Sequence, residues 1–350
     1  MQYSIIVPAF NTADTLETAV SSILHCGLTD YEILLIDDGS QDRTPEICDA
    51  LSSKYSCVRC IHQKNQGVSA ARNCGLSRAQ GAYIWFFDSD DQVDPGSMVR
   101  AAQVIEEESP DVLMFGLSFD YYHRDRIYER VEYSYPHEKK MTYRDLQDAF
   151  SELYYDNILT PCWNKVIRKS VLQDNKIGFD PELFSMEDLQ FSLRMLQYCG
   201  SIYLLPNVIY RFRQEERRTK KAFGRDNKRM ARIPDITEYL TKFQPLLADY
   251  REVLTGLYYM MLREKLSTRR PSEMAEIAEK YRRSPYSREP YTRYLNPEQR
   301  TLASQLKNGE YGKLAFRFRK ERIRNTAVSR IKRSAVYRLL WGSSPKTTSV

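Results

Sequence analysis

A short apolar run that ends in acids constrains this chain more than any other segment does. Residues 82–87 read Ala-Tyr-Ile-Trp-Phe-Phe, and Asp88, Asp90 and Asp91 follow. A continuous run of aromatic and β-branched residues is typical of a strand buried on both faces. Carboxylates this close repel each other, and a hard divalent cation with oxygen ligands removes that cost. The segment therefore predicts a metal site at the carboxyl end of a buried strand, where open α/β sheets bind ligands.

The metal prediction assumes that the chain stays extended through the acids, so that Asp88 and Asp90 point to the same side. In the alternative interpretation, the acids form a solvated turn before a helix. Asp94 would then cap that helix, and Pro95 would take its first position. Spacing alone does not decide between the two interpretations.

Buried strands and amphipathic helices alternate over the first 120 residues. Helical periodicity separates five apolar runs that predict strands, at residues 4–8, 33–36, 57–62, 82–87 and 111–119. This alternation predicts an α/β fold with a doubly wound, mostly parallel sheet and helices on both faces. The alternation then ends, and four prolines between residues 271 and 297 divide a smaller, charged region into short helices.

Composition excludes several classes of protein. The chain has 350 residues, enough for two domains, and its 42% hydrophobic and 28% charged residues are ordinary for a globular protein. No segment approaches the roughly 18 apolar residues of a membrane span. Met1 leads directly into a strand pattern, so we expect no signal peptide. Seven scattered cysteines are typical of reduced thiols, and we expect a cytoplasmic protein.

One pair of cysteines has the spacing of a metal-binding motif. Cys57 and Cys60 form a CxxC, and His62 follows two residues later. No second CxxC follows, and the segment alternates like a strand. We therefore do not predict a zinc site in this segment.

Four segments together resemble one known family. They are Ser-Ile-Ile-Val-Pro-Ala-Phe-Asn at 4–11, Ile-Asp-Asp-Gly-Ser at 36–40, Asn-Gln-Gly-Val-Ser-Ala-Ala-Arg-Asn at 65–73 and Asp-Ser-Asp-Asp at 88–91. Their order and spacing are similar to those of bacterial family 2 glycosyltransferases, over roughly residues 3–215. The resemblance implies a GT-A fold and an inverting enzyme of the hexosyltransferase type. Its donor would be a nucleotide-sugar, and we expect a UDP-sugar.

The resemblance implies a donor site built around a Mn²⁺ or Mg²⁺ ion. Asp90 would bind the metal, with Asp88 and Asp91 beside it, and the metal would hold the donor diphosphate. The resemblance places the following residues against the nucleotide-sugar: Pro8, Phe10, Asp37, Asp38, Asn65, Arg72, Asp88 and Arg213.

Structural alternatives exist for most of these donor residues. Pro8 and Phe10 would otherwise pack at a strand end, and Arg72 would be an exposed helical arginine. Asp38 is expected to contact the base or ribose, with Asp37 as its rival, and a capped turn is the alternative for this pair. After Arg213, many relatives continue with a small hydroxyl residue, whereas this chain has Glu-Glu-Arg-Arg at 215–218. How the donor site closes is therefore open.

The resemblance also implies a catalytic base in the acceptor half. Asp188, in the sequence Ser-Met-Glu-Asp at 185–188, matches the aspartate that takes the proton of the acceptor hydroxyl. Four further residues are placed on the acceptor side: Trp163, Asn164, Lys165 and Glu187. The alternative for Asp188 is a capping box with Ser185 at the start of a helix.

The resemblance and the helical periodicity together divide the chain into three parts. Residues 1–218 would form the glycosyltransferase domain, with a nucleotide-sugar half at 1–120 and an acceptor half at 121–218. A helical region, 219–312, and a basic tail, 313–350, follow. The acceptor would be a saccharide, free or linked to polyprenyl diphosphate, in surface polysaccharide biosynthesis.

The basic tail has an amphipathic pattern. Residues 313–340 hold ten Lys and Arg residues against one acid, and apolar residues recur every three or four positions. This pattern predicts a helix that lies on an anionic membrane through residues 313–341, with the protein peripheral on the inner face of the plasma membrane. The alternatives are a helix packed on the protein and a nucleic-acid patch, and we expect no nucleic-acid partner.

Two other functions stay open at this point. A haloacid-dehalogenase-like phosphotransferase also places Asp-x-Asp after a buried strand, but Asp91 stands where that family has Thr or Val. A non-catalytic nucleotide-binding module would bind the nucleotide without transferring a sugar.

Overall fold

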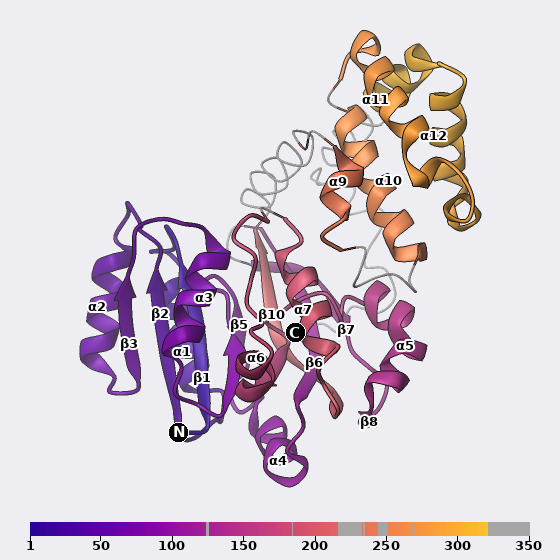
Figure 1. Cartoon of the computed structure of the whole chain (residues 1–350). Coiled ribbons are helices and arrows are strands. Elements are labelled where there is room, and N and C mark those ends of the chain that lie inside the picture. The colour runs from indigo at the N-terminus through magenta and orange to yellow at the C-terminus, as the bar shows by residue number, and fades with distance from the viewer. Residues whose placement is uncertain are drawn as a thin grey trace, which may run out of the picture. The chain divides into compact units, whose positions relative to one another are not determined.

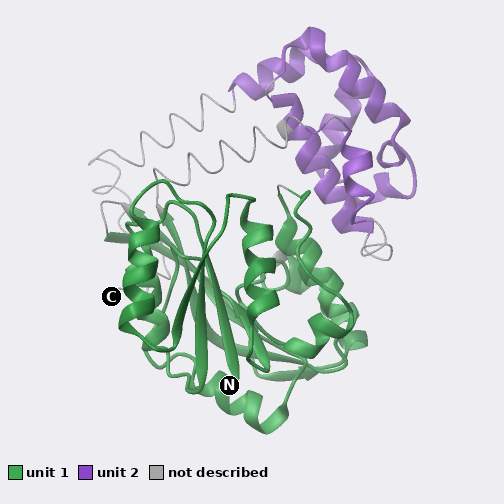
Figure 2. Cartoon of the chain, turned by 60° about the vertical axis from the view of Figure 1, so that its left-hand side comes forward, with its two compact units in different colours: residues 1–219 green, residues 220–350 purple. Residues whose placement is uncertain are grey.

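The structure is a computed structural model, and it describes residues 1–123, 126–183, 185–215, 233, 235–243, 251–267 and 269–320. The chain divides into two compact units, Met1–Thr219 and Lys220–Val350 (Figures 1 and 2). The sequence placed its first boundary between residues 218 and 219. Both positions fall among residues 216–232, which lie outside the described residues.

The first half of unit 1 alternates strands and helices. Strands β1 (Tyr3–Ala9), β2 (Tyr31–Asp37), β3 (Val58–His62) and β4 (Tyr83–Phe86) are connected by α1 (Leu16–Leu24), α2 (Thr44–Lys54) and α3 (Val68–Arg78). The strands lie in the order β3-β2-β1-β4, and neighbours run parallel. The prediction of a mostly parallel α/β sheet flanked by helices is confirmed for this half (Figure 1).

The second half of unit 1 extends the same sheet with mixed strand directions. The elements are β5 (Gln92–Val93), α4 (Val99–Glu108), β6 (Val112–His123), β7 (Arg126–Tyr133), β8 (Lys139–Met141), α5 (Tyr143–Tyr155), β9 (Lys165–Arg168), α6 (Lys169–Asp174), α7 (Glu187–Leu196) and β10 (Ile202–Glu215). Strand β9 lies antiparallel between β4 and β6, whereas β10 runs parallel to β6. Within the described residues, the sheet has ten strands.

The apolar run before the acids forms the centre of the sheet. Trp85 and Phe86 have no exposed surface, and the Trp85 ring meets the ring of Phe115 edge-on at 6.0 Å. The expected extension of the strand through the acids is wrong, because β4 ends at Phe86 and the amide of Asp91 donates to the carbonyl of Asp88 in a turn. The alternative helix start near Pro95 is also wrong, since α4 begins only at Val99.

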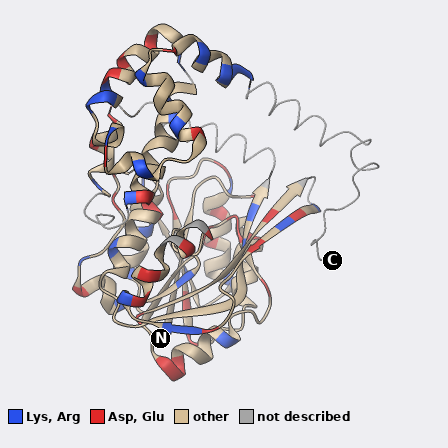
Figure 3. Ribbon diagram, turned by 90° about the vertical axis from the view of Figure 1, so that its right-hand side faces the viewer, with Lys and Arg blue, Asp and Glu red and all other residues tan. Residues whose placement is uncertain are grey.

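Unit 2 is helical in its described part. It contains α9 (Ile236–Leu240), α10 (Arg251–Ser267), α11 (Pro271–Arg283), the 3₁₀ helices η2 (Pro285–Ser287) and η3 (Tyr291–Tyr294), α12 (Pro297–Lys307) and a last helical stretch at 311–320. Three of these elements begin with proline, which is tolerated at the first helical position and confirms the expected short helices. Figure 3 shows acidic and basic residues interspersed along these helices.

Two predictions concern membranes. Among the described helices, none combines the length and the apolar character that crossing a bilayer requires. Most of the basic tail, residues 321–350, lies outside the described residues, so the predicted amphipathic helix is described only at its beginning.

Candidate active site

The carboxyl ends of β1, β2 and β4 meet at one edge of the sheet, because these strands run parallel in register. Helix α3 follows this edge and packs closely on β1: a Cβ atom at Gly75 would lie 2.3 Å from Cγ2 of Ile6. Any side chain at position 75 would therefore push the helix away from the sheet. This close approach fixes how far Arg72, which lies one turn earlier on the same helix, stands from the sheet.

Arg72 is the centre of the site. Its Nη2 lies 3.0 Å from Oδ1 of Asp88, and its Nη1 lies 2.6 Å from Oδ1 of Asp188 and 3.8 Å from Oε1 of Glu187. The guanidinium also lies over the ring of Phe179, 5.0 Å from the ring centre. Arg72 is only 3% exposed, which excludes the alternative of an exposed helical arginine.

Asp188 is placed in the first turn of α7, but it does not cap the helix. Met186 occupies the N-cap position with a φ of 61°, and its side chain makes no capping hydrogen bond. Ser185 therefore does not take the N-cap position that the capping-box alternative gives it. Instead, the Asp188 carboxylate points to Arg72, which brings the acceptor half of the sequence to the acidic turn after β4.

Electrostatics at this point favour a bound cation. Burial raises the pKa of Asp88, although Arg72 opposes that shift. Burial and the neighbouring Asp188 raise the pKa of Glu187 to about 7. Burial lowers the pKa of Arg72, but Asp188 and the other carboxylates hold it well above its ordinary value. Three carboxylates thus share one guanidinium, and the cluster is short of positive charge.

Asp91 belongs to the structure of the acidic turn. It is 1% exposed; its Oδ2 accepts a hydrogen bond from Tyr210 Oη at 2.7 Å, and its Oδ1 accepts one from the Arg213 amide at 2.8 Å. The Asp88 amide in turn donates to Tyr210 Oη at 3.0 Å. Both carboxylate oxygens of Asp91 are engaged within the protein, so the structure does not support its expected role as a metal ligand. Asp88 and Asp90 are the residues that could hold a divalent cation.

Asp38 shapes the loop that leads into α3. It is 3% exposed; its Oδ1 accepts hydrogen bonds from Gln63 Nε2 and the Gln66 amide, and its Oδ2 accepts one from the Gly67 amide at 2.8 Å. Gly67 has a φ of 90°, a conformation that favours glycine. The carboxylate thus orders the main chain around the exposed Asn65. Contact of Asp38 with a base or ribose stays a prediction.

The other residues at this edge of the sheet differ in how much surface they expose. Pro8 is buried within β1, as the packing alternative proposed, whereas Phe10 directly after the strand is 46% exposed. Asp37 is buried; its Oδ1 accepts from the Ser40 amide, and its Oδ2 lies 2.9 Å from His62 Nδ1. Of these residues, Phe10 presents the largest accessible surface.

Asn164 and Lys165, which the sequence places on the acceptor side, have no exposed surface. Lys165 Nζ donates to the carbonyls of Ile158 and Pro161 and to Asn164 Oδ1, and burial lowers its pKa to about 7. These hydrogen bonds hold the 158–165 segment together, and contact of either residue with an acceptor stays a prediction. Trp163 is also buried, and its ring stacks on Tyr210 at 4.2 Å.

Arg213 lies on β10 with its guanidinium over the ring of Tyr122, 4.1 Å from the ring centre. The charged residues that follow it, 216–218, lie outside the described residues, so the closing of the donor site stays open. Sequence reasoning missed Tyr210 and Phe179. Tyr210 lies three residues before Arg213, which the resemblance places against the nucleotide-sugar, whereas Phe179 lies in no motif.

Comparisons with known proteins identify relatives of this chain. Residues 4–174 match the family model "Glycosyl transferase family 2". The "Uncharacterized glycosyltransferase EpsJ" of Bacillus subtilis is 28% identical over 214 residues, 60% of either chain. The "Cholesterol galactosyltransferase" of Borreliella burgdorferi is 29% identical over 59% of this chain and 58% of its own. These matches thus span about 60% of the length of the curated relatives.

The fold comparison covers more of the chain. The crystal structure of S. aureus TarS 1–349 in complex with UDP-GlcNAc superimposes with a TM-score of 0.62 at 19% identity, covering 92% of both chains. The same protein in complex with UDP gives a TM-score of 0.60 at 20% identity. TarS therefore shares the fold of this chain. Since the family model and the curated relatives point to one family, residues 4–174 of this chain are a family 2 glycosyl transferase domain.

Proposed function

We propose that this protein is an inverting glycosyltransferase that moves a sugar from a nucleotide-sugar to a saccharide hydroxyl. One observation carries the proposal: the Arg72 guanidinium bridges Asp88 of the acidic turn and Asp188 of α7. Through this bridge, the expected donor site and the expected base contact the same buried guanidinium. An Asp-x-Asp turn alone would also fit a phosphotransferase, but neither the bridge nor the family match supports that alternative.

The donor site of this proposal lies at the carboxyl edge of the sheet. Asp88 and Asp90 would hold Mn²⁺ or Mg²⁺, which supplies charge neutralisation for the departing nucleoside diphosphate. The exposed ring of Phe10 is suited to stack on a nucleobase, beside the loop that Asp38 orders. We take the donor to be a UDP-sugar, because TarS has been crystallised with UDP-GlcNAc on the same fold.

The acceptor hydroxyl would be deprotonated by Asp188. An inverting displacement requires a base next to the acceptor, opposite the leaving group. Asp188 remains accessible for this role, since about a fifth of its side chain is exposed. Arg72 positions this carboxylate by its short contact with Oδ1. Glu187 is a weaker candidate, because its raised pKa leaves it partly protonated near neutral pH.

The acceptor class is the least specified part of the proposal. Relatives named for polymer glycosylation, such as the "Poly(ribitol-phosphate) beta-N-acetylglucosaminyltransferase TarS" of Staphylococcus aureus, favour a saccharide or polymer of the cell surface. An acceptor carried on polyprenyl diphosphate would explain a basic tail that binds the inner face of the membrane. In this proposal the protein is cytoplasmic and peripheral.

A panel of nucleotide-sugars tests the function. Each donor is incubated with the full chain and Mn²⁺, and the melting temperature and the released nucleoside diphosphate are measured. We expect one donor to raise the melting temperature and to release its nucleotide faster when saccharide acceptors are added. Stabilisation without turnover for every donor and acceptor pair would instead identify a binding module.

A further inference from the structure

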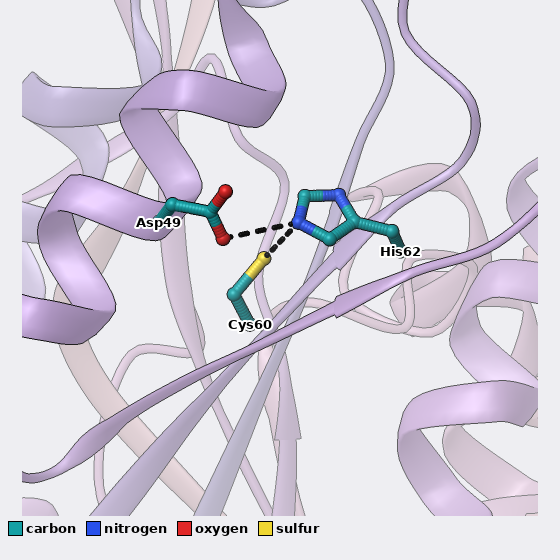
Figure 4. A group of neighbouring side chains, drawn as sticks. All are labelled: Asp49, Cys60 and His62. Carbon is teal, nitrogen blue, oxygen red and sulfur yellow. Dashed lines mark hydrogen bonds and ion pairs between the residues drawn. The ribbon is translucent and has the colours of Figure 1, made fainter.

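Three side chains converge at the outer strand of the sheet, away from the acidic turn. Cys60 and His62 lie two residues apart on β3 and therefore on the same face of the strand. Asp49 reaches them from α2, which packs against this strand (Figure 1). Figure 4 shows the Asp49 carboxylate and the Cys60 thiol approaching the same nitrogen of His62.

The distances within this cluster are close to those between side chains that bind one metal ion. His62 Nε2 lies 3.1 Å from Asp49 Oδ1 and 3.3 Å from Cys60 Sγ, and all three atoms lie within 4.8 Å of one another. Bond lengths to Zn²⁺ of roughly 2.3 Å for sulfur and 2.0–2.1 Å for nitrogen and oxygen set the separations of tetrahedral ligands at about 3.6 Å for S···N and about 3.3 Å for N···O. The two distances that involve His62 Nε2 therefore lie within a few tenths of an ångström of those that one ion requires, and the sulfur and the oxygen lie within 4.8 Å of each other.

A second carboxylate orients the histidine. The opposite ring nitrogen, His62 Nδ1, lies 2.9 Å from Oδ2 of the buried Asp37. A carboxylate on one nitrogen fixes the tautomer, because it holds the proton on Nδ1 and leaves the Nε2 lone pair for a metal. This arrangement of carboxylate, histidine and metal is common around zinc in proteins.

The thiol environment fits the same use. Cys48, which is fully buried next to Asp49, forms a hydrogen bond with Cys60, and this bond and the nearby His62 lower the pKa of Cys60. The thiolate is the form of cysteine that binds metals.

A simple ion pair accounts for only part of this geometry. Hydrogen bonds to Asp37 and Asp49 raise the pKa of His62 to about 9, so a proton between His62 and Asp49 is the competing occupant. A single proton on Nε2 serves one acceptor well, whereas a metal ion engages the oxygen, the nitrogen and the sulfur together. A proton alone does not explain why Cys60 also approaches this nitrogen.

We propose that Asp49, Cys60 and His62 form a binding site for a borderline-soft divalent metal such as Zn²⁺, distinct from the acidic turn at Asp88. The mixed sulfur, nitrogen and oxygen ligands suit Zn²⁺ or Co²⁺ and not the hard ions Mg²⁺ and Mn²⁺. Water completes the coordination, since the side chains of His62 and Asp49 are 43% and 68% exposed. Through Asp37, the metal would order the ends of β2 and β3 beside the carboxyl edge of the sheet, where we propose that the nucleotide binds.

Cobalt spectroscopy tests this site directly. The full chain is treated with chelator, reduced and titrated with Co²⁺ in the presence of saturating Mg²⁺, which occupies carboxylate-only sites. We expect one Co²⁺ per chain with a thiolate-to-metal charge-transfer band in the near ultraviolet, displaced by Zn²⁺ but not by further Mg²⁺. Cys60→Ser is expected to abolish the band, and Asp49→Asn to weaken Co²⁺ binding by about tenfold or more.

Cys57→Ser is the matched control, because among the described residues Cys57 precedes the same strand and lies outside the group of three. It should leave the band unchanged. Asp49→Asn keeps the protein folded in this test, since the side chain is exposed, and circular dichroism checks each variant. Absence of the band, or a band that persists in Cys60→Ser, overturns the proposal. Neither result depends on glycosyl transfer, so the outcome is independent of the proposed function.

Discussion

Arg72 Nη1 and Asp188 Oδ1 lie 2.6 Å apart, although 116 residues separate them in the sequence. Arg72 comes from the first turns of α3, in the predicted nucleotide half, and Asp188 lies in the first turn of α7, in the predicted acceptor half. A buried guanidinium that also contacts Asp88 fixes the two halves at one point. The chemistry that we propose depends on this bridge, and the first two predictions test its two ends.

Asp188→Asn separates catalysis from structure. The amide is isosteric and its oxygen still accepts a hydrogen bond from Arg72, but it cannot take a proton. We expect turnover to fall by about 10²–10⁴-fold while donor affinity is nearly unchanged. Steady-state kinetics and donor titration measure the two quantities. Asp174→Asn, an exposed acid at the end of α6, serves as control and should keep full activity. A normal rate for Asp188→Asn would move the base to Glu187.

Arg72 should matter for stability as well as for activity. Arg72→Ala leaves three partly buried carboxylates without their shared cation, and removing one partner of a buried ion pair costs about 3–5 kcal/mol. Arg72→Lys keeps the charge but has no fork to bridge two carboxylates, so we expect a smaller loss of stability and a clear loss of kcat. Urea unfolding and kinetics measure both effects. Equal stability of Arg72→Ala and wild type would contradict the bridge.

The parallel half of the fold could be predicted because β1, β2 and β4 are buried along almost their whole length and α1 and α4 each show one apolar face. The mixed half could not. Strand β9 supplies only four residues, and its antiparallel place between β4 and β6 depends on partners distant in sequence. Local propensity carries no information on such pairings.

The candidate site shows the same division. Arg72, Asp88 and Asp188 could be anticipated from motifs, but their contacts could not, since each contact joins segments that only the fold brings together. Asn164 and Lys165 looked like ligands because polar residues in a motif usually face one. Their burial against main-chain carbonyls becomes visible only in three dimensions.

Glu187 predicts a specific pH dependence of stability. Burial and Asp188 raise its folded pKa to about 7, above the value of 4.5 for an unperturbed glutamate. Between these values the folded state binds more protons than the unfolded state, so the free energy of unfolding should fall as pH rises from 4.5 to 7. Glu187→Gln removes this loss. We expect the variant to gain stability over wild type by up to about 3 kcal/mol at pH 8 and by almost nothing near pH 4.

Urea unfolding at pH 4, 6 and 8 checks the Glu187 prediction, with the exposed Glu17→Gln as control. The control should show no difference that grows with pH. A stability difference between Glu187→Gln and wild type that is constant across the three pH values would show that Glu187 is not raised in pKa.

The basic tail predicts salt-sensitive membrane binding. Cations near an anionic bilayer contribute on the order of 1 kcal/mol each, and residues 313–340 hold ten. We expect the full chain to sediment with vesicles containing phosphatidylglycerol, less so at high salt, and not with neutral vesicles. A chain truncated after residue 311 should stay in the supernatant. Equal sedimentation of the truncated and full chains would assign the binding to another surface.

The acidic turn allows a matched pair of substitutions. Asp90→Ala should abolish the restoration of sugar transfer by Mn²⁺ or Mg²⁺ after EDTA treatment, with little change in melting temperature, because we propose Asp90 as a metal ligand. Asp91→Ala should instead lower the melting temperature more than it affects the response to metal. It leaves the Tyr210 hydroxyl and the Arg213 amide without their acceptor, at a cost of about 1–3 kcal/mol for each buried group, so stability should fall first. Metal-dependent kinetics and thermal unfolding of the two variants, measured together, distinguish a ligand from a structural carboxylate. A fully active Asp90→Ala in the presence of EDTA would exclude the proposed metal site.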